Sequence, residues 1–285
     1  MRISNFTLLI QKLITLAFLL FTGTSFSIAA TVDTIVTYSP AMKKNIKAVV
    51  IRPSNSEVSA ALPVVYLLHG HGGNYANWIS KAPELKNYSD QYKILIVCPD
   101  GETASWYFDS PELPGSRYET YISVELVNWI DKHYPTIKSK SGRAITGLSM
   151  GGHGALYLAF KHQDVFGAAG SMSGGLDLRP FPKNWSIAAH LGSYAEHPDN
   201  WVQNSVINLT HLLTPGSLKL MIDCGTQDFF YNVNDAFHQK LLDTNIPHDF
   251  ISRPGTHDWN YWRNAVKYQL LFMSDYFSQN TLLRN

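Results

Sequence analysis

The sequence has little cysteine, little charge and no long unbroken apolar run, and each shortage excludes a class of protein. Two cysteines, Cys98 and Cys224, are too few for a disulfide framework, and both end apolar runs, where buried free thiols are expected. Charged residues make up only 16% and the net charge is +1, so no imbalance draws the chain to nucleic acid or to an anionic membrane. A hydrophobic share of 45% indicates instead a large buried core.

The N-terminus has the order of a secretory signal peptide. Arg2 and Lys12 precede the apolar run Leu13–Phe21, and small residues follow up to Ala30. A membrane anchor is the alternative, but a span needs about 20 apolar residues, and the polar or small residues 22–25 interrupt this one. We therefore expect a cleaved leader at 1–30, a single domain at 31–285, no stable membrane insertion, and a secreted or periplasmic protein. Nothing in the sequence indicates the oligomeric state.

Short apolar runs alternate with helical patterns after the leader. Such runs are typical of strands buried on both faces, as in a parallel sheet. The runs are Asp33–Tyr38, Ile46–Arg52, Val64–Leu68, Ile94–Val97, Arg143–Thr146, Phe166–Ala169, Leu218–Ile222 and His248–Ser252. Helical patterns cover Tyr121–Tyr134, Gly151–His162, Asn232–Thr244 and Trp259–Phe277. This alternation predicts an α/β fold with a mostly parallel sheet.

One long stretch, Leu176–Asn208, fits none of these patterns. It contains two prolines after Arg179 and two tryptophans, Trp185 and Trp201. An insertion of this length in an α/β domain usually covers a site, and we expect that here.

Residues 147–151 form the pattern G-x-S-x-G with Ser149 at its centre. A β-run precedes it and a small-residue helix follows, which is the strand–turn–helix setting that a serine nucleophile requires. An ordinary glycine-rich turn is the alternative. The setting favours Ser149 as a nucleophile.

A serine hydroxyl needs a histidine base, and the histidine needs a carboxylate to orient it. In this architecture the chain order is Ser, then Asp or Glu, then His. His257 follows the last strand, whereas His238 and His248 lie inside a helix and at a strand start. Asp228 follows the preceding strand. The other candidates are less suitable: Asp223 should still lie in the strand, Asp235 lies in the helix, and Asp258 is too close to His257 in the chain to turn back onto its ring.

Acyl transfer also needs backbone amides directed at the developing oxyanion. In this architecture one belongs to the residue after the nucleophile, Met150, and the other to the loop after an early strand, for which we choose His71. A zinc site at His69-x-His71 is the alternative. No third ligand is spaced nearby, so we expect no metal.

Together these motifs resemble the esterase D and S-formylglutathione hydrolase-like group, which also holds the antigen 85 mycolyltransferases and many feruloyl and acetylxylan esterases. The resemblance covers about residues 33–278. It rests on segments 66–73, 99–101, 106–111, 118–122, 147–152, 224–228 and 255–259, which occur in one order. It implies an α/β-hydrolase fold with strand order 1-2-4-3-5-6-7-8, no cofactor, and the roles given above for Ser149, Asp228, His257 and the His71 amide. By that strand order, three strands separate the two cysteines, so the resemblance implies no disulfide.

The sequence departs from two members of the group. Its first loop reads His-Gly-His where the cytosolic formylglutathione enzymes resemble a Ser-Gly-Leu-Thr-Cys pattern, and the orienting acid is Asp228 where antigen 85 has Glu. The leader also argues against the cytosolic role.

The function expected is therefore an exported serine esterase that hydrolyses carboxylic esters through an acyl-serine intermediate. Acetyl or feruloyl esters of plant polysaccharides are the expected substrates, by analogy of fold and location. We expect Trp106 and Tyr107, with aromatic residues of the insertion, to face the substrate; core packing is the alternative for both. Other functions that remain open are an acyltransferase with the same triad, an S-formylglutathione hydrolase-like thioesterase, and a non-catalytic carbohydrate-binding protein.

Overall fold

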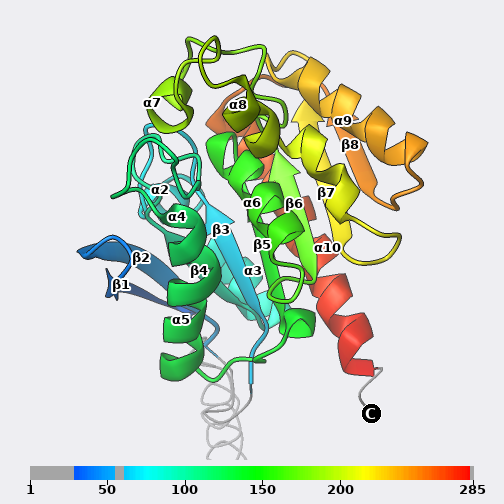
Figure 1. The fold of residues 1–285 in the computed structure, drawn as a ribbon. Coiled ribbons are helices and arrows are strands. Elements are labelled where there is room, and N and C mark those ends of the chain that lie inside the picture. The colour runs from blue at the N-terminus through cyan, green and yellow to red at the C-terminus, as the bar shows by residue number, and fades with distance from the viewer. Residues whose placement is uncertain (1–28, 55–60, 283–285) are drawn as a thin grey trace, which may run out of the picture.

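The computed structural model describes residues 29–54 and 61–282, and the expected leader lies outside them except for its last two residues. The centre of the fold is an eight-stranded sheet in the order β1-β2-β4-β3-β5-β6-β7-β8 (Figure 1). The strands are β1 Thr31–Ser39, β2 Lys44–Arg52, β3 Val64–Leu68, β4 Leu95–Pro99, β5 Arg143–Gly147, β6 Ala168–Met172, β7 Lys219–Gly225 and β8 Asp249–Arg253. The predicted strand order is confirmed.

Only the first two strands run antiparallel to their neighbours. β1 pairs with β2, and β2 pairs with β4, in antiparallel register. From β4 to β8 every pair is parallel. The carboxyl ends of the parallel strands therefore meet at one edge of the sheet, where the loops that carry function are expected.

Helices cover both faces of the sheet, and apolar side chains fill the two layers between. The helices are α2 Asn77–Lys81, α3 Leu85–Tyr92, α4 Tyr118–Thr120, α5 Val127–His133, α6 Met150–Lys161, α7 Ile187–Leu191, α8 Pro198–Asn204, α9 Tyr231–Asp243 and α10 Trp259–Leu282, with a π-helix η1 at Tyr121–Leu126 and 3-10 turns η2 Lys140–Gly142 and η3 Val206–Leu212. Helices α5 and α6 lie in front of the sheet in Figure 1, with α3 and α10 behind. Both faces of the central strands are thus buried, as their apolar runs predict.

Strand β6 differs from its predicted range. The apolar run Phe166–Ala169 ends at Gly170, yet the strand begins at Ala168 and continues to Met172. A Cβ at Gly170 would lie 1.7 Å from Gln269 Oε1 of α10, so the glycine leaves room for this buried side chain, which accepts a hydrogen bond from Thr146. The apolar run therefore breaks where the strand does not.

The helical pattern at Tyr121–Tyr134 is also more complex than predicted. One helical segment runs from Tyr118 to His133, and its middle is the π-helix η1. There Tyr121, Ile122 and Ser123 are buried in succession, an arrangement that a 3.6-residue period does not predict.

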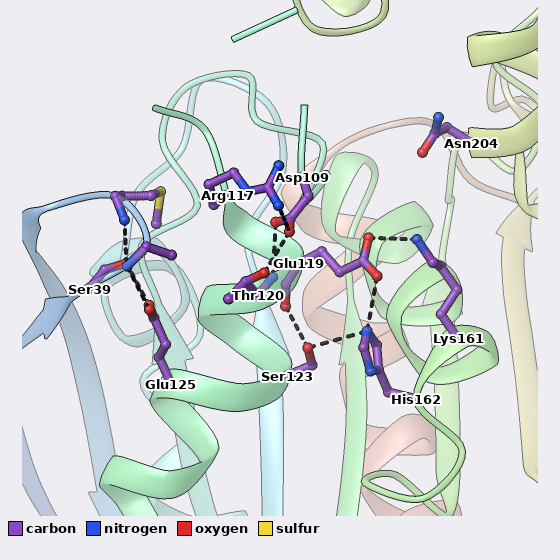
Figure 2. A network of polar contacts seen from close by, with 12 residues as sticks. Ser39, Asp109, Arg117, Glu119, Thr120, Ser123, Glu125, Lys161, His162 and Asn204 are labelled. Carbon is purple, nitrogen blue, oxygen red and sulfur yellow. Dashed lines mark hydrogen bonds and ion pairs between the residues drawn. The ribbon is translucent and has the colours of Figure 1, made fainter. Parts of the chain in front are cut away.

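A buried carboxylate ties this segment to α6 (Figure 2). Glu119 accepts hydrogen bonds from Tyr157 Oη (2.8 Å), Lys161 Nζ (2.7 Å) and His162 Nε2 (3.0 Å). Burial acts to raise the pKa of Glu119, but these hydrogen bonds and the Lys161 charge outweigh it and lower the pKa to about 2. The contact joins two helices on the same face of the sheet.

Candidate active site

Ser149 lies in the turn between β5 and α6, in a backbone conformation that most residues avoid. Its φ is 54° and its ψ is −118°. The turn is also crowded: a Cβ at Gly147 would lie 2.5 Å from the Gly151 carbonyl oxygen, and one at Gly151 would lie 2.6 Å from that of His69. The two glycines of the motif therefore let the turn close and place the serine at the carboxyl edge of the sheet.

The structure brings Ser149, His257 and Asp228 into one hydrogen-bonded chain. His257 Nε2 lies 2.8 Å from Ser149 Oγ, and His257 Nδ1 lies 2.8 and 3.0 Å from the two carboxylate oxygens of Asp228. With Nδ1 donating to Asp228, Nε2 is left to accept the serine proton. This is the geometry that the sequence predicts for a nucleophile, a base and an orienting acid.

The surroundings of this chain fix the orientation of its members. The Asp228 side chain is fully buried, and the Phe230 amide donates a hydrogen bond to it at 2.8 Å. The His257 ring packs against Phe229 and Trp262, with centroid distances of 4.1 and 4.8 Å. Held by these two rings and anchored by Asp228, it presents one nitrogen to Ser149.

The other carboxylates and histidines considered from the sequence lie elsewhere. Asp223 is the buried partner of Arg253 and Tyr261, and Asp258 accepts from the Tyr261 amide at the start of α10. His238 and His248 are hydrogen-bonded to each other. In the described residues none of the four is hydrogen-bonded to Ser149, His257 or Asp228.

Two backbone amides next to Ser149 are available to an oxyanion. The Met150 amide is the first of α6, and such N–H groups have no acceptor within the helix. The His71 amide follows Gly70, where a Cβ would lie 3.3 Å from that of Ser149. Throughout the part of the chain that the structure describes, neither amide donates to a backbone carbonyl.

His69 holds in place the loop after β3 that carries the His71 amide. Its Nδ1 donates to the Gly70 carbonyl and its Nε2 accepts from the Gly101 amide, both at 2.8 Å. Burial lowers the pKa of His69, so the ring is neutral, as this pair of bonds requires. Both nitrogens are thus engaged, and within the described ranges no group of three or more His, Cys, Asp or Glu could hold a metal.

A pocket of about 460 Å³ opens over Ser149 and His257. Aromatic side chains form much of its wall: Trp185, Phe229, Trp259 and Trp262. Trp185 belongs to the insertion, as expected. The other three lie near predicted site residues in the chain, because Phe229 follows Asp228, and Trp259 and Trp262 come two and five residues after His257, yet the sequence argument did not assign them.

Trp106 and Tyr107 do not lie in this pocket, which corrects the prediction that they face the substrate. Both are buried, with 1% and 0% of their surface exposed. Consecutive positive φ values of 50° and 62° turn both side chains into the core. There Tyr107 Oη donates to the His69 carbonyl and Trp106 Nε1 to the Trp185 carbonyl, so these residues support the site from behind.

The insertion lies over the carboxyl ends of the strands, with α7 and α8 at the top of Figure 1. Hydrogen bonds attach it to the body: His153 Nε2 of α6 donates to the Asn204 carbonyl (2.8 Å), and Ser110 Oγ donates to that of His190 (2.7 Å). Its position agrees with the expected cover, and its contacts make it a fixed wall.

Among the residues described, no helix has both the length and the apolar content to cross a membrane.

Comparison with known proteins gives consistent results. The sequence profile of the family described as "Putative esterase" matches residues 39–273. An acetyl esterase from Caldicellulosiruptor saccharolyticus is 27% identical over 258 residues, which are 83% of this chain and 96% of that protein. Among solved structures, a ferulic acid esterase matches with a TM-score of 0.76 and 27% identity. The match covers 87% of this chain and 98% of the ferulic acid esterase chain. An S-formylglutathione hydrolase from Staphylococcus aureus shares the fold, with a TM-score of 0.74 and 23% identity. The match covers 86% of this chain and 99% of that one.

Proposed function

The chain belongs to the "Putative esterase" family and is a carboxylic ester hydrolase, and we propose that it is exported and works through an acyl-Ser149 intermediate. The observation that carries the mechanism is the hydrogen-bonded chain from Asp228 through His257 to Ser149. The expected leader carries the proposal of export.

In the first half of the reaction Ser149 Oγ attacks the ester carbonyl carbon while His257 Nε2 takes its proton. The Asp228 carboxylate stabilises the resulting imidazolium, and the His71 and Met150 amides donate to the oxyanion. Breakdown of the tetrahedral intermediate breaks the bond to the alcohol oxygen, which takes the proton from His257. The acyl group stays on Ser149.

In the second half water repeats the attack on the acyl carbon. His257 takes a proton from the water, the acyl–Ser149 bond breaks, and Ser149 recovers its proton from His257. The acid is released. An acyltransferase would differ only in admitting an acceptor alcohol faster than water.

The substrates we propose are acetyl or feruloyl esters of plant polysaccharides. Two relatives are described as an acetyl esterase and a ferulic acid esterase. The aromatic walls of the pocket offer a planar acyl group faces on which to stack, an arrangement that stabilises ring pairs by about 1 kcal/mol.

A substrate panel tests this proposal. The wild type should hydrolyse p-nitrophenyl acetate and at least one of acetylated xylan and methyl ferulate, and Ser149→Ala should lose at least about 10⁴-fold in kcat with its fold intact. Adding an alcohol to the assay separates a transferase, which would form a new ester, from a hydrolase. A Ser149→Ala variant with a tenth of wild-type turnover would refute the mechanism.

Export is tested separately by the N-terminus of the protein recovered from its native host. We expect mass spectrometry to find a chain that begins at Thr31. An intact chain in the soluble cell fraction would refute export without affecting the esterase assignment.

A further inference from the structure

A second buried carboxylate lies in the strand that leads to Asp228, and the mechanism does not use it. Asp223 belongs to β7, and its side chain has no exposed surface. Arg253 Nη2 and Tyr261 Oη each donate a hydrogen bond to it, both at 2.5 Å. These three residues form the Asp223 cluster. Because a buried ion pair often stabilises a fold no better than well-packed apolar side chains would, what the cluster holds in place matters more than its contribution to stability.

The two partners of Asp223 lie at opposite ends of the loop that carries His257. This base loop, residues 254–258, follows Arg253, the last residue of β8, and ends where α10 begins. Tyr261 lies in the first turn of α10. One carboxylate therefore ties both ends of the base loop together and fixes the end of the strand relative to the start of the helix.

The middle of the base loop is bonded to the loop that carries Asp228. The Gln227 amide donates to the Gly255 carbonyl at 3.0 Å, and the Gly255 amide donates to Gln227 Oε1 at 2.6 Å. A Cβ at Gly255 would lie 2.2 Å from Tyr261 Cδ2, so the ring of Tyr261 packs directly on the base loop. The acid and the base therefore belong to two loops that are hydrogen-bonded to each other next to Asp228 and close to His257.

The start of α10 transmits this restraint to the catalytic ring. Trp262 follows Tyr261 in the helix and packs against the His257 ring, with a centroid distance of 4.8 Å. Among the described residues, the ring itself is hydrogen-bonded only to Ser149 and Asp228. The cluster can therefore affect catalysis only through the position of the ring. An error of about 1 Å in such a position can lower a rate about 10²-fold.

We propose that the Asp223 cluster and Gln227 are positioning residues, which hold His257 in place for proton transfer. The inference rests on the proposed mechanism, in which His257 moves a proton in both halves of the reaction, and it adds the residues that keep this base in place. Because they act through His257 and not on the substrate, their loss lowers kcat and leaves KM unchanged. A purely structural cluster would lower the stability of the fold and leave the kcat of folded molecules unchanged.

Tyr261→Phe removes one hydrogen bond of the cluster and keeps the aromatic ring on the base loop. With p-nitrophenyl acetate we expect kcat to fall about tenfold or more and KM to stay within about twofold of wild type. Tyr121→Phe is the matched control, because Tyr121 is also buried and its hydroxyl is hydrogen-bonded to Thr37 of β1 at 2.7 Å. It should lower the melting temperature by a similar amount and leave kcat within about twofold of wild type. Equal losses of kcat in the two variants, or no loss in Tyr261→Phe, would overturn the inference.

Asp223→Asn tests the carboxylate itself. An amide has one oxygen acceptor where the carboxylate has two, so it can hold one end of the base loop but not both. We expect kcat to fall at least as far as in Tyr261→Phe, again with KM within about twofold of wild type. Since the change leaves Arg253 without its charged partner, thermal unfolding first establishes that the variant folds; if it does not, the Tyr261 and Gln227 variants decide. A folded variant with wild-type kcat would contradict the inference.

Gln227 gives a test that leaves the buried cluster intact. Its side chain is exposed, so Gln227→Ala should keep nearly the melting temperature of wild type while lowering kcat severalfold. Gln227→Glu should retain kcat within about twofold of wild type, because its carboxylate can still accept a hydrogen bond from the Gly255 amide. If the alanine variant is as active as wild type, or if glutamate is no better than alanine, the bond to Gly255 does not position the base and the inference is wrong.

Proton NMR reports the position of the ring without any turnover. The proton on His257 Nδ1 gives a far-downfield signal while it is bonded to Asp228, and its absence in His257→Gln identifies it. We expect this signal in the wild type and in the tyrosine control, and its loss through faster exchange with water in the positioning variants. A sharp signal in those variants despite a lower kcat would overturn the inference. Loss of the signal in an enzyme whose Ser149→Ala variant stays active would refute the proposed mechanism and leave the positioning role standing.

Discussion

Asp228 and Asp258 both lie near His257, but their surroundings give them different tasks. Asp228 is buried and bonded to His257 Nδ1, whereas Asp258 bonds Thr256 Oγ1 and the Tyr261 amide at the start of α10. The sequence could separate them because a carboxylate adjacent in the chain cannot easily turn back onto the ring. The geometry follows that argument.

We therefore expect Asp228→Asn to lower kcat about 10⁴-fold, because an amide in that place can favour the wrong histidine tautomer. Asp258→Asn, the matched control, should lower kcat less than threefold and change stability by less than about 0.5 kcal/mol, because asparagine caps a helix about as well as aspartate. Steady-state kinetics and urea unfolding measure the two effects. Equal losses of kcat in both variants would contradict the assignment.

The role of His71 belongs to its backbone rather than to its exposed side chain. Replacing the side chain with alanine keeps the amide, so His71→Ala should retain kcat within about threefold. His71→Pro removes the N–H and should lower kcat at least about 10²-fold, the loss measured when one oxyanion donor is removed. Melting temperatures exclude unfolding as the cause. If the alanine variant loses as much as the proline variant, the imidazole and not the amide is required.

Trp106 and Tyr107 show where reasoning from single residues stops. Tryptophan and tyrosine in a loop are typical of a binding surface, and nothing in the local sequence indicates two successive left-handed residues. That conformation depends on contacts far away in the chain, since Tyr107 packs against Gly154 and donates to the His69 carbonyl. Sequence patterns therefore identified the catalytic candidates but not the side chains that shape the pocket.

Among the elements, the strands were easier to predict than the helices. Strands such as β3 are short apolar runs bounded by proline and glycine, and Val64–Leu68 was predicted to the residue. The 3.6-residue period indicates a helix before Tyr134 but contains no signal for η1, because the extra residue of a π-turn changes which side chains face inward. Helix α3 was missed, since its residues are mostly polar.

The carboxylate of Glu119 links the η1 segment to α6 and gives a prediction at this scale. Its pKa is lowered from 4.5 to about 2 in the folded protein, so it stabilises the fold fully above about pH 4.5 and loses this effect as the pH falls towards 2. Between pH 5 and pH 3 the wild type should lose about 2 kcal/mol more stability than Glu119→Gln.

Urea unfolding at the two pH values measures this difference. Glu196→Gln, an exposed carboxylate whose side chain bonds only Ser193 nearby, is the control and should behave as the wild type does. Identical pH dependence in Glu119→Gln and wild type would show that the contact contributes nothing to folding.

On the scale of the whole molecule, the sheet order determines the state of the cysteines. Cys98 lies near the end of β4 and Cys224 near the end of β7, with β3, β5 and β6 between them. Four steps of about 4.8 Å place them roughly 19 Å apart, beyond the reach of a disulfide of about 7 Å. Both are buried free thiols in the structure, and burial raises the pKa of each.

We therefore expect a thiol reagent to label neither cysteine in the native protein and both after denaturation without reductant. Buried, protonated thiols are poor nucleophiles, so the native reaction should be slow even at pH 8. Finding no free thiol in a denatured monomer would mean that the two residues are bridged and that the sheet order is different.

The insertion at Leu176–Asn208 has a consequence for turnover. Its carbonyls at Trp185, His190 and Asn204 accept hydrogen bonds from the body of the protein. An ester entering the pocket therefore orders no loop and incurs little entropic penalty from the protein. Such an enzyme selects its substrates by shape and polarity alone, and its rate should not depend on solvent viscosity through the motion of a lid.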